Sequence, residues 1–401
     1  MPPTRNVTST AAFPQRGRTG SASRQLPLAV EIIDATTTLQ ALRREWDDLY
    51  LQAAERTVFQ SFGWVFAWWH TVGQSSGFRL AIVVVRERGR PVLIWPLVKR
   101  RRGIWRIGSW AGAETGQYND VLCADGEHRH DWLEAAWTHF RKNMGLDVID
   151  FPALRDDGIV LPFLRAMRGS VGASEPAAVN DLPPTRDWAG WEKSQSRGFR
   201  KDLRRRRRRL AECGEVRFEL VHDTAAIEEA VALAIEHKAA WLTARNLYGR
   251  FIEHPQATAW LTDACLSAHR NGMLHLAVLR LDGRVIACNI GFLDQGCLYN
   301  YLGSFDLAFR QYSPGVILTQ DLLQWSFDNG VRMFDMMPPA DDYKMRWCNT
   351  TIGTSAFISF QGAMGLLAKA WYSELPRQAA LNLYRRLPRS WRRQAIRCFG
   401  A

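Results

Sequence analysis

The sequence predicts an α/β protein of two similar units, each with a mixed, mostly antiparallel sheet flanked by helices. The 401 residues are enough for two domains of ordinary size, and the apolar fraction of 47% supplies a sizeable core. Short apolar runs bounded by turn residues alternate with segments of helical periodicity. The order strand, helix, helix, hairpin, helix, strand occurs in both halves, without a repeat at the level of residues.

The first unit is assigned to residues 28–168, after a tail at 1–27 that is rich in Ser, Thr, Pro and Arg. We expect this tail to be disordered; a transit peptide is the alternative. Leu39, Leu42, Trp46 and Leu49 recur at helical spacing, and Thr38 is placed to cap their helix. In order, the pattern predicts a strand at 28–34, helices at 39–53 and 58–72, a hairpin turning at 88–90, a helix at 132–143 and a strand at 146–154.

The second unit is assigned to residues 196–365, after a linker at 169–195 rich in Gly, Ala, Pro and Asp. A basic helical tail is expected at 366–401. The second series consists of a basic helix at 199–212, a strand at 216–221, helices at 224–242 and 256–270, a hairpin at 274–293, a strand at 297–303, a helix at 314–329 and a strand at 331–337.

The charge and the cysteine content of the chain indicate which partners and which cellular compartment to expect. The net charge of +12 favours an anionic partner such as nucleic acid, a membrane surface or a phosphorylated ligand. The seven cysteines are odd in number and contain no CxxC pair, which indicates reduced thiols in a cytoplasmic protein. No histidine pair has metal-ligand spacing, so we expect no metal. No apolar run reaches about 18 residues, the length of a membrane-spanning helix.

The turn Arg310-Gln311-Tyr312-Ser313-Pro314-Gly315 comes directly before an apolar helix. Such a turn presents unpaired N–H groups and the positive end of a helix dipole to an anion. Pro314 suits the first helical turn, and Ser313 is able to cap it. The turn therefore predicts a pyrophosphate site; an ordinary hairpin-to-helix turn with a solvated Arg310 is the alternative.

Several short motifs follow one another in a defined order between about 40 and 350. They are Phe59, Ser61, Trp64, Trp68-Trp69 and Trp95-Pro96-Leu97 in the first half, and 196–210, Trp241, 281–287, 299–306, 312–315, Asp335 and Tyr343-Lys344 in the second. In this order they resemble the GCN5-related N-acetyltransferase (GNAT) superfamily. More narrowly, the chain is similar to bacterial CelD/BcsL-type acetyltransferases of cellulose and exopolysaccharide biosynthesis. Its double-unit architecture resembles the Fem aminoacyl transferases.

The resemblance implies tandem GNAT-like units, of which the first is degenerate and the second binds acetyl-CoA as co-substrate. In such folds the pantetheine arm inserts between two splayed strands, and we place it against the strand 285–292. The implied cofactor-binding residues are Ile290, Arg310, Gln311, Tyr312, Ser313 and Gly315. Ser313 stands where the family's turn has its first Gly, which leaves acetyl-CoA, a longer acyl-CoA and an aminoacyl carrier open as donors.

Acyl transfer requires a polarised thioester carbonyl, a proton for the leaving sulfur and a path for the acceptor's proton. The backbone N–H near Ile290 is the candidate for the carbonyl and Tyr301 for the sulfur. Asp335 and Asp306 are candidate general bases, and Tyr343 and Lys344 are candidate ligands of the acceptor or a phosphate. The alternatives are core packing for Tyr301, a strand-end cap for Asp335, a surface charge for Lys344 and catalysis by proximity with water relaying the proton.

Two basic segments bear on the acceptor. Six consecutive arginines, 204–209, occupy one predicted helix, and Arg204 is assigned to substrate binding. The arginines either form a solvated helix face or bind an anion. The anion would be a polyanionic acceptor, a phosphorylated lipid-linked sugar or, least favoured, nucleic acid. From Arg385 to Arg397 six arginines are interleaved with apolar residues, which suits either an anionic membrane surface or a packed helix with a solvated face.

These inferences predict a cytoplasmic acyl-CoA-dependent acyltransferase, in peripheral contact with the inner membrane face. Its acceptor is a hydroxyl or amine of a sugar or polysaccharide precursor in envelope or exopolysaccharide biosynthesis. The alternatives are a Fem-like aminoacyl transferase that uses aminoacyl-tRNA and a non-catalytic basic module that binds nucleic acid or membrane.

Overall fold

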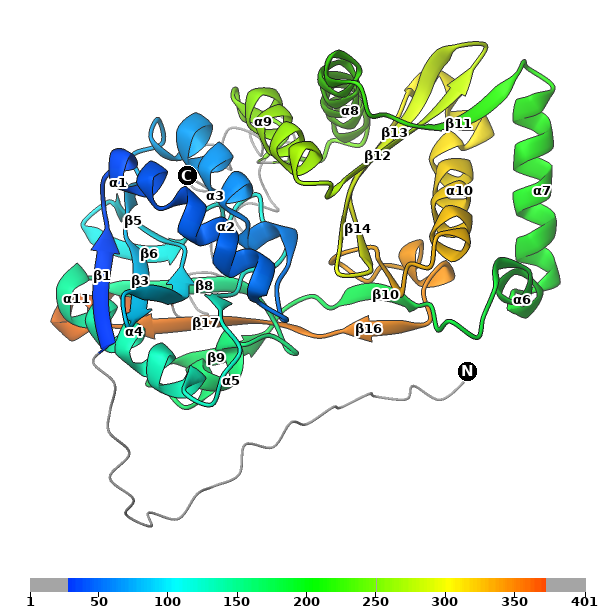
Figure 1. Ribbon diagram of the computed structural model, residues 1–401. Helices are drawn as coiled ribbons and strands as arrows, with labels where there is room; N and C mark the ends of the chain where they lie inside the picture. The colour runs from blue at the N-terminus through cyan, green and yellow to red at the C-terminus, as the bar shows by residue number, and fades with distance from the viewer. Residues whose placement is uncertain (1–27, 250, 373–401) are drawn as a thin grey trace.

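The computed structural model describes residues 28–249 and 251–372, which form two adjoining α/β bodies (Figure 1). The predicted fold class is confirmed: mixed, mostly antiparallel sheets are flanked by helices in both bodies. The predicted tail at 1–27 lies outside the described residues, as do residues 373–401 of the tail predicted at 366–401.

The first body contains a four-stranded sheet of order β1-β3-β4-β7 and a six-stranded sheet of order β2-β5-β6-β8-β17-β9. Its elements up to the crossover are β1 (Leu28–Ile33), α1 (Thr36–Ala41), α2 (Arg43–Gln52), η1 (Val58–Gln60), α3 (Phe62–Trp68), η2 (Trp69–Gly73), β2 (Arg79–Leu80), β3 (Ile82–Glu87), β4 (Arg90–Trp95), β5 (Leu97–Arg102), β6 (Trp105–Trp110), β7 (Leu122–Cys123), α4 (Arg129–Met144), β8 (Val148–Arg155), α5 (Val160–Arg165) and β9 (Ser170–Ala173). The helix expected at 39–53 is divided at Leu42, and the one expected at 58–72 is divided at Ser61.

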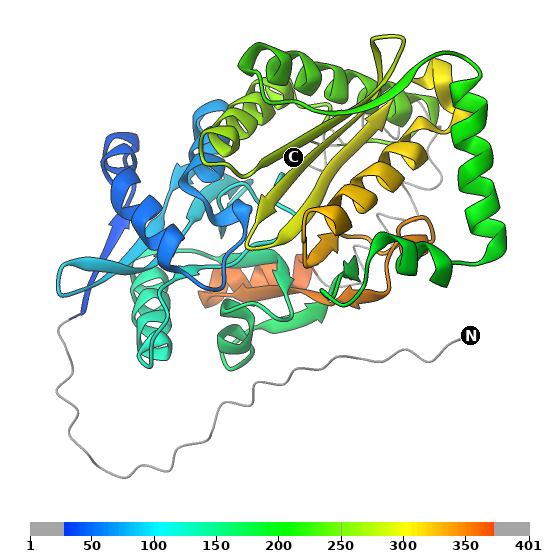
Figure 2. The ribbon, with the colours of Figure 1, turned by 45° about the vertical axis from the view of Figure 1, so that its right-hand side comes forward.

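The second body is built on a seven-stranded sheet of order β11-β12-β13-β14-β15-β10-β16. Its elements are β10 (Ala177–Asp181), α6 (Trp188–Ser194), α7 (Arg197–Ala211), β11 (Val216–Leu220), α8 (Thr224–Ala244), α9 (Ala257–Arg270), β12 (Leu274–Leu281), β13 (Arg284–Asp294), β14 (Cys297–Phe305), η3 (Leu307–Tyr312), α10 (Pro314–Asp328), β15 (Met333–Asp335), η4 (Lys344–Arg346) and β16 (Thr350–Ile352). Helices α8 and α9 cover one face of the sheet and α7 and α10 the other (Figure 2).

The two bodies exchange strands. The segment predicted as a linker, 169–195, contains β9, β10 and α6, and β10 pairs with β15 and β16 of the second sheet. After β16 the chain returns, because β17 (Thr354–Phe360) pairs with β8 and β9 of the first body and leads into α11 (Gly362–Tyr372). Figure 1 shows β16 and β17 running in line from one body to the other. Two chain crossings therefore tie the bodies together.

Aromatic side chains fill the seam between the bodies. Trp64 of α3 packs edge-on against Trp260 of α9, with ring centres 5.0 Å apart, and against Phe292 of β13 at 5.4 Å. These residues belong to one buried cluster that continues from α2 and α3 into α8, α9 and the second sheet. The bodies thus share a hydrophobic core, in which Trp46, Trp64, Trp68, Trp69 and Trp260 are buried.

Gly63 permits the close approach of α3 to α9. A Cβ atom at this position would lie 1.9 Å from Ser267 Oγ and 2.7 Å from Ser267 Cβ. We expect Gly63→Ala to lower the free energy of unfolding by about 1–3 kcal/mol, because α3 and α9 would have to separate. Chemical denaturation measures this change. Gly198→Ala is the matched control, since nothing lies within 4 Å of its Cβ position; an equal loss there would contradict the contact as the cause.

Within the described ranges, no helix is both long enough and apolar enough to cross a bilayer.

Candidate functional site

Strands β14 and β15 run parallel and then separate. They are paired only from Cys297 with Met333 to Tyr299 with Asp335, where β15 ends. Strand β14 continues to Phe305, and over 300–305 its only partner strand in the described chain is β13. The register of β13 and β14 also shifts between Ile290 and Gly291, so an irregularity lies where the two parallel strands diverge. One edge of β14 is therefore left for a further extended chain.

The strand assigned to the cofactor in the sequence analysis is corrected by this topology. Ile290 lies in β13 and is fully buried, with Leu276 of β12 on one side and Leu302 of β14 on the other. A strand in the middle of a sheet has its backbone groups paired on both edges, so Ile290 is not placed to polarise a bound carbonyl. The free edge belongs to the next strand, β14.

The turn before α10 has a residue in a left-handed conformation directly ahead of the helix. Ser313 adopts a left-handed conformation, with φ 56° and ψ 55°, and Pro314 opens the helix. A Cβ atom on Gly315 would meet only Phe305 Cδ1, at 3.4 Å, so the first turn is open on that side. Arg310 and Gln311 are exposed on η3, directly before this turn.

Three arginines of the run on α7 lie against η3 and α10. Arg206 donates to Ser313 Oγ, Arg207 pairs with Asp321 of α10, and the Arg209 guanidinium lies 5.7 Å from the centre of the Tyr312 ring. Arg204, the arginine chosen from the sequence, instead has its guanidinium 3.8 Å from a carboxylate oxygen of Glu192. The structure thus brings the run to the predicted anion site through its other members.

Lys238 of α8 reaches the free edge of β14. Its ammonium lies 3.4 Å from the carbonyl oxygen of Gly303 and 4.8 Å from the centre of the Trp241 ring. The Arg245 guanidinium packs on the same ring at 4.4 Å. Burial, and then the charge of Arg245, lower the pKa of Lys238. Among the described residues no carboxylate pairs with Lys238, so this edge of the sheet carries uncompensated positive charge.

Lys344 lies on the opposite side of the same opening. Its ammonium donates to the carbonyl oxygens of Met337 and Pro338, at 2.9 and 3.0 Å, in the segment that follows β15. Burial lowers the pKa of Lys344, the carboxylates of Asp341 and Asp335 oppose that change, and the charge of Lys238 adds to it. Two cations therefore flank the space between β14 and the end of β15.

Tyr343 connects this loop to α10. Its hydroxyl lies 3.0 Å from Thr319 Oγ1, and that hydroxyl donates to the carbonyl oxygen of Gly315 at 2.8 Å. The side chain is 41% exposed, so its ring faces solvent beside the first turn of α10. The predicted acceptor residues Tyr343 and Lys344 are thus brought near the predicted anion site.

Asp335 is fully buried in the seam between the two bodies. Its carboxylate accepts hydrogen bonds from Tyr118 Oη, at 2.8 and 2.9 Å, and from the Met337 N–H at 2.7 Å, and lies 3.4 Å from Arg155 Nη1. Burial raises the pKa of Asp335, while the Arg155 charge opposes that rise. A carboxylate with these partners joins the bodies, and we no longer assign it the role of general base.

Tyr301 and Asp306 are likewise engaged in structural contacts. Tyr301 donates from its hydroxyl to the carbonyl oxygen of Thr115 at 2.8 Å, inside the aromatic cluster of the seam. Asp306 caps η3 by accepting from the Ala308 N–H at 2.9 Å and pairs with Arg284 at 2.5 Å. The core-packing reading of Tyr301 agrees with these contacts, and neither side chain faces the opening between β14 and β15 with a free polar atom.

Sequence reasoning missed Lys238, Arg206, Tyr118 and Arg155. Lys238 is preceded by His237 and followed at helical spacing by Trp241 and Arg245, which is a signal for a basic, aromatic helix face. Arg206 was hidden in a run of identical residues. Tyr118 and Arg155 carry no local signal, because only the packing of the bodies brings them to Asp335.

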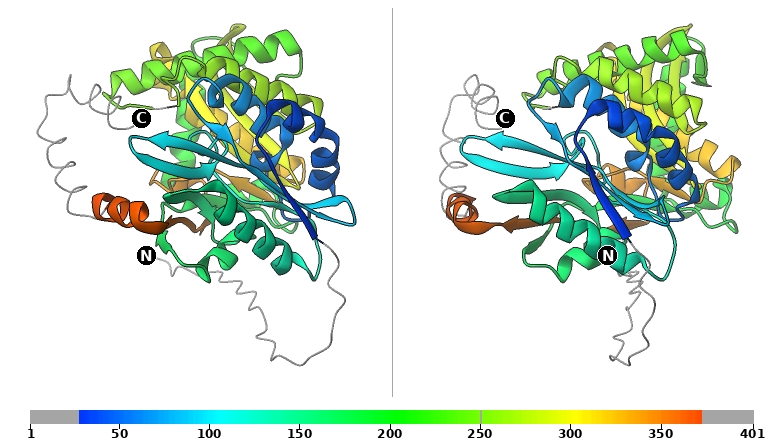
Figure 3. Two further views of the ribbon diagram at one scale, coloured as in Figure 1. Left: turned by 90° about the vertical axis from the view of Figure 1, so that its left-hand side faces the viewer. Right: turned by 60° about the vertical axis from the view of Figure 1, so that its left-hand side comes forward.

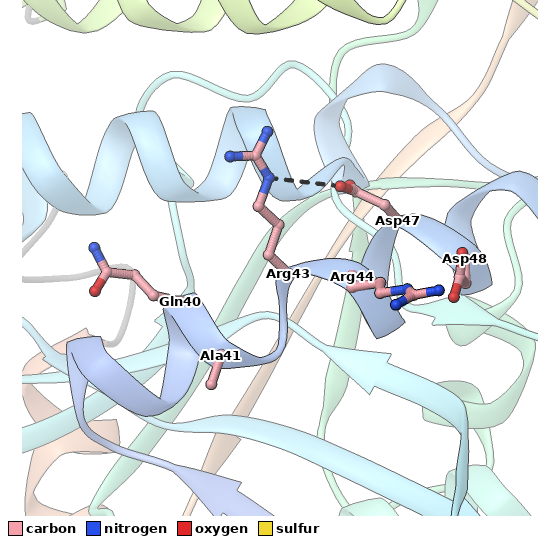
Figure 4. A pocket seen from close by; sticks show the side chains of 6 residues that line it. All are labelled: Gln40, Ala41, Arg43, Arg44, Asp47 and Asp48. Carbon is pink, nitrogen blue, oxygen red and sulfur yellow. Dashed lines mark ion pairs between the residues drawn. The ribbon is translucent and has the colours of Figure 1, made fainter.

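A hollow of about 380 Å³ lies on the first body, away from the opening described above. Figure 4 shows its lining on α1 and α2, with Arg43 and Asp47 paired at 3.7 Å. Its lining comes from two helices of the first body alone and includes both cations and carboxylates, so the strand topology and not this hollow defines the candidate site. In the described chain no group of three or more His, Cys, Asp or Glu side chains is placed to hold a metal ion.

His275 of β12 predicts a pH dependence of stability. The ring is 4% exposed and packs edge-on against Trp325 at 4.2 Å, and burial lowers its pKa from 6.5 to about 4. The unfolded chain therefore binds a proton below pH 6.5 that the folded chain does not bind until about pH 4. The free energy of unfolding should therefore decrease as the pH is lowered from 6.5 to 4, by about 3 kcal/mol in total. Urea unfolding of wild type and His275→Phe at pH 7 and pH 4.5 measures this, and equal losses in both proteins would contradict it.

Residues 197–345 match the family model described as "Acetyltransferase (GNAT) domain", which covers a little over a third of the chain. The matched range spans α7 to η4 and includes β14, α10 and β15. No curated protein matches the sequence.

Solved structures resemble nearly the whole described chain. FemX aligns with a TM-score of 0.57 at 12% identity, covering 85% of this chain and 99% of its own. The C-terminal domain (DUF2156) described as part of a lysylphosphatidylglycerol synthetase from Agrobacterium fabrum aligns at 0.53 and 15% identity, covering 82% and 95%. L-PGS from Bacillus licheniformis aligns at 0.51 and 10% identity, covering 83% and 95%. At these identities the likeness shows a common fold of two joined bodies.

Proposed function

We propose that the protein is an acyltransferase that moves an acetyl or other acyl group from acyl-CoA to a hydroxyl or amine of a sugar or polysaccharide precursor. The observation that carries the proposal is the separation of β14 from β15 beside the N-terminus of α10. It offers an unpaired strand edge to an extended arm and helix N–H groups to a pyrophosphate in one place. The match of residues 197–345 to an acetyltransferase family supports the same reading.

The chain's own groups suit a donor of this shape. The backbone of β14 at 301–305 would bind the amide groups of the pantetheine arm, and the turn at Ser313, with Arg206, would bind phosphate oxygens. Lys238 and Lys344 supply positive charge near the strand edge, where negative charge develops on the thioester oxygen. Acyl-CoA itself supplies the thioester.

The reaction then balances without a dedicated carboxylate base. The acceptor oxygen or nitrogen forms a bond to the acyl carbon, the carbon–sulfur bond breaks, and the thiolate takes up a proton. Because Asp335 and Asp306 are held by other groups, we assign the acceptor's proton to water and the rate enhancement mainly to positioning.

The acceptor and setting rest on the resemblance of the motifs to CelD/BcsL-type enzymes of exopolysaccharide biosynthesis. One observation favours aminoacyl transfer from tRNA as the second candidate. Arg204, Arg205 and Arg208 are exposed on α7, the helix whose Arg206 contacts Ser313 of the α10 turn, and a polyanion could compete there with the nearby carboxylates of Glu192, Asp202 and Glu212.

Calorimetric titration with acetyl-CoA separates these candidates, with desulfo-CoA and a tRNA pool as comparators. We expect saturable binding of acetyl-CoA and desulfo-CoA, because both carry the pyrophosphate and the pantetheine arm. Binding of tRNA alone, lost on addition of salt, would overturn the acyl-CoA proposal in favour of aminoacyl transfer or a binding module.

A further inference from the structure

The turn between β5 and β6 and the helix α11 project from the same side of the first body (Figure 3). Ala368 of α11 packs on Ile107 of β6 and Val148 of β8, which holds the helix against the hairpin. Next to this contact, three apolar side chains point to solvent: Ile104 is 65% exposed, Leu366 is 66% exposed and Leu367 is 60% exposed. Few large apolar side chains of the described chain are so exposed.

The position of Ile104 is unusual for a water-facing turn. Arg102 pairs with Trp105, so Gly103 and Ile104 form a two-residue hairpin loop. Gly103 has φ 59°, as the first position of such a loop requires, and the second position ordinarily holds a polar residue. Neither the turn geometry nor the core explains an isoleucine there, whereas a partner that receives an apolar side chain does.

Positive charge surrounds the three apolar side chains. Lys99 to Arg102 are four consecutive cations leading to the loop, and residues 97–108 contain no acidic residue. Arg106 pairs with Asp147 at 2.9 Å and Arg100 lies 3.8 Å from Glu114, so part of this charge is compensated. Arg101 and Lys369 are exposed and have no ion pair among the described residues.

We propose that Arg101, Ile104, Leu366, Leu367 and Lys369, the hairpin–α11 surface, dock the protein on an anionic lipid bilayer. Apolar side chains that enter the boundary of headgroups and acyl chains, beside cations that contact anionic headgroups, are the two elements of peripheral binding. A protein partner would need a broader apolar surface than three side chains on two elements offer.

The test uses the full chain and sedimentation with vesicles of phosphatidylcholine, alone or mixed with phosphatidylglycerol. We expect wild type to bind the mixed vesicles at least about tenfold more tightly than the neutral ones. Ile104→Glu and Leu367→Glu should each weaken binding by about tenfold or more, and Arg101→Glu by a similar factor. The matched controls are Leu51→Glu, at a leucine of α2 that is 72% exposed, and Arg208→Glu on α7, whose side chain is 74% exposed.

Loss of binding in the three surface variants with retention in both controls would support the proposal. Wild-type binding in all variants would overturn it and assign any membrane contact to the chain beyond α11. Absence of vesicle binding, with a dimer in solution that Leu367→Glu dissociates, would overturn it in favour of contact with a second copy. Because no step involves acyl transfer, the result is independent of the proposed activity.

Discussion

Replacement of Asp335 by alanine should lower the free energy of unfolding by about 2–4 kcal/mol. The carboxylate is fully buried, and its removal leaves the Tyr118 hydroxyl and the Met337 N–H without their acceptor, while Arg155 keeps its ion pair with Asp157 at 2.8 Å. Buried donors that lose their only acceptor are costly, because nothing replaces the hydrogen bonds that water makes to them in the unfolded chain. Chemical denaturation measures the loss, and Tyr118→Phe, which removes one hydroxyl, should reproduce about 1–2 kcal/mol of it.

Asp306→Ala is the control for this prediction. Asp306 is also an aspartate that the sequence suggests as a base, but its partner Arg284 is 65% exposed and its other contact is the cap of η3. Its removal should change stability by only about 1 kcal/mol. If Asp335→Ala folds with wild-type stability and has lost only activity, Asp335 is a catalytic group and not a contact that joins the bodies.

Gly315→Asp should weaken binding of acetyl-CoA by about 100-fold. A carboxylate in the first turn of α10 would stand within about 5–6 Å of a bound pyrophosphate, which is unfavourable by about 3 kcal/mol at an effective dielectric constant of 20. The same carboxylate should stabilise the free protein by up to about 1 kcal/mol, because it interacts favourably with the helix N-terminus. Opposite changes in stability and affinity are therefore expected in one variant.

Gly315→Ala separates charge from bulk. A Cβ atom at this position approaches only Phe305 Cδ1, at 3.4 Å, so the alanine variant should bind acetyl-CoA as wild type does. Calorimetric titration measures both affinities, and denaturation measures both stabilities. Wild-type affinity in the aspartate variant would show that the pyrophosphate binds elsewhere, and equal loss in the alanine variant would contradict repulsion as the cause.

The arrangement of charges suggests a division of labour between the two bodies. The second body carries the strand edge, the α10 turn and the lysines Lys238 and Lys344, whereas the first supplies Tyr118 and Arg155, which hold the end of β15 through Asp335. Asp335 is the last residue of β15, at the point where β14 departs. The first body thereby fixes the position of the opening between the strands.

Local pattern was sufficient for most elements of the second body. The apolar periodicity placed α8, α9 and α10 within a few residues of their observed ends, and the turn at Asp282-Gly283 placed the hairpin of β12 and β13. The start of the helix at Pro314 was predicted as well, because a Pro at a helix start is a signal carried by a few adjacent residues, whereas anion binding at 310–315 stays a prediction. The boundaries assigned to the units remain predictions.

The local sequence pattern did not predict which strands pair when they are far apart in the chain. Strands β10 and β17 are short, and their partners lie more than 150 residues away in the sequence. Their own residues therefore do not indicate that β10 joins the second body and β17 the first. The same limit explains the strand error at Ile290: apolar character predicts a buried strand, but only the sheet order shows which strand has a free edge. For Asp335, chemical type suggested a base, and only its environment revealed Arg155 and Tyr118.

By itself the sequence determined the α/β class, the order of elements and the start of α10 at Pro314, since each depends on residues that are neighbours along the chain. The tertiary structure alone decided which strand edge is open, which arginines face the turn and which carboxylates are already engaged. Those properties depend on contacts between residues that are far apart in the sequence, and such contacts produce no periodic pattern of residues along the chain.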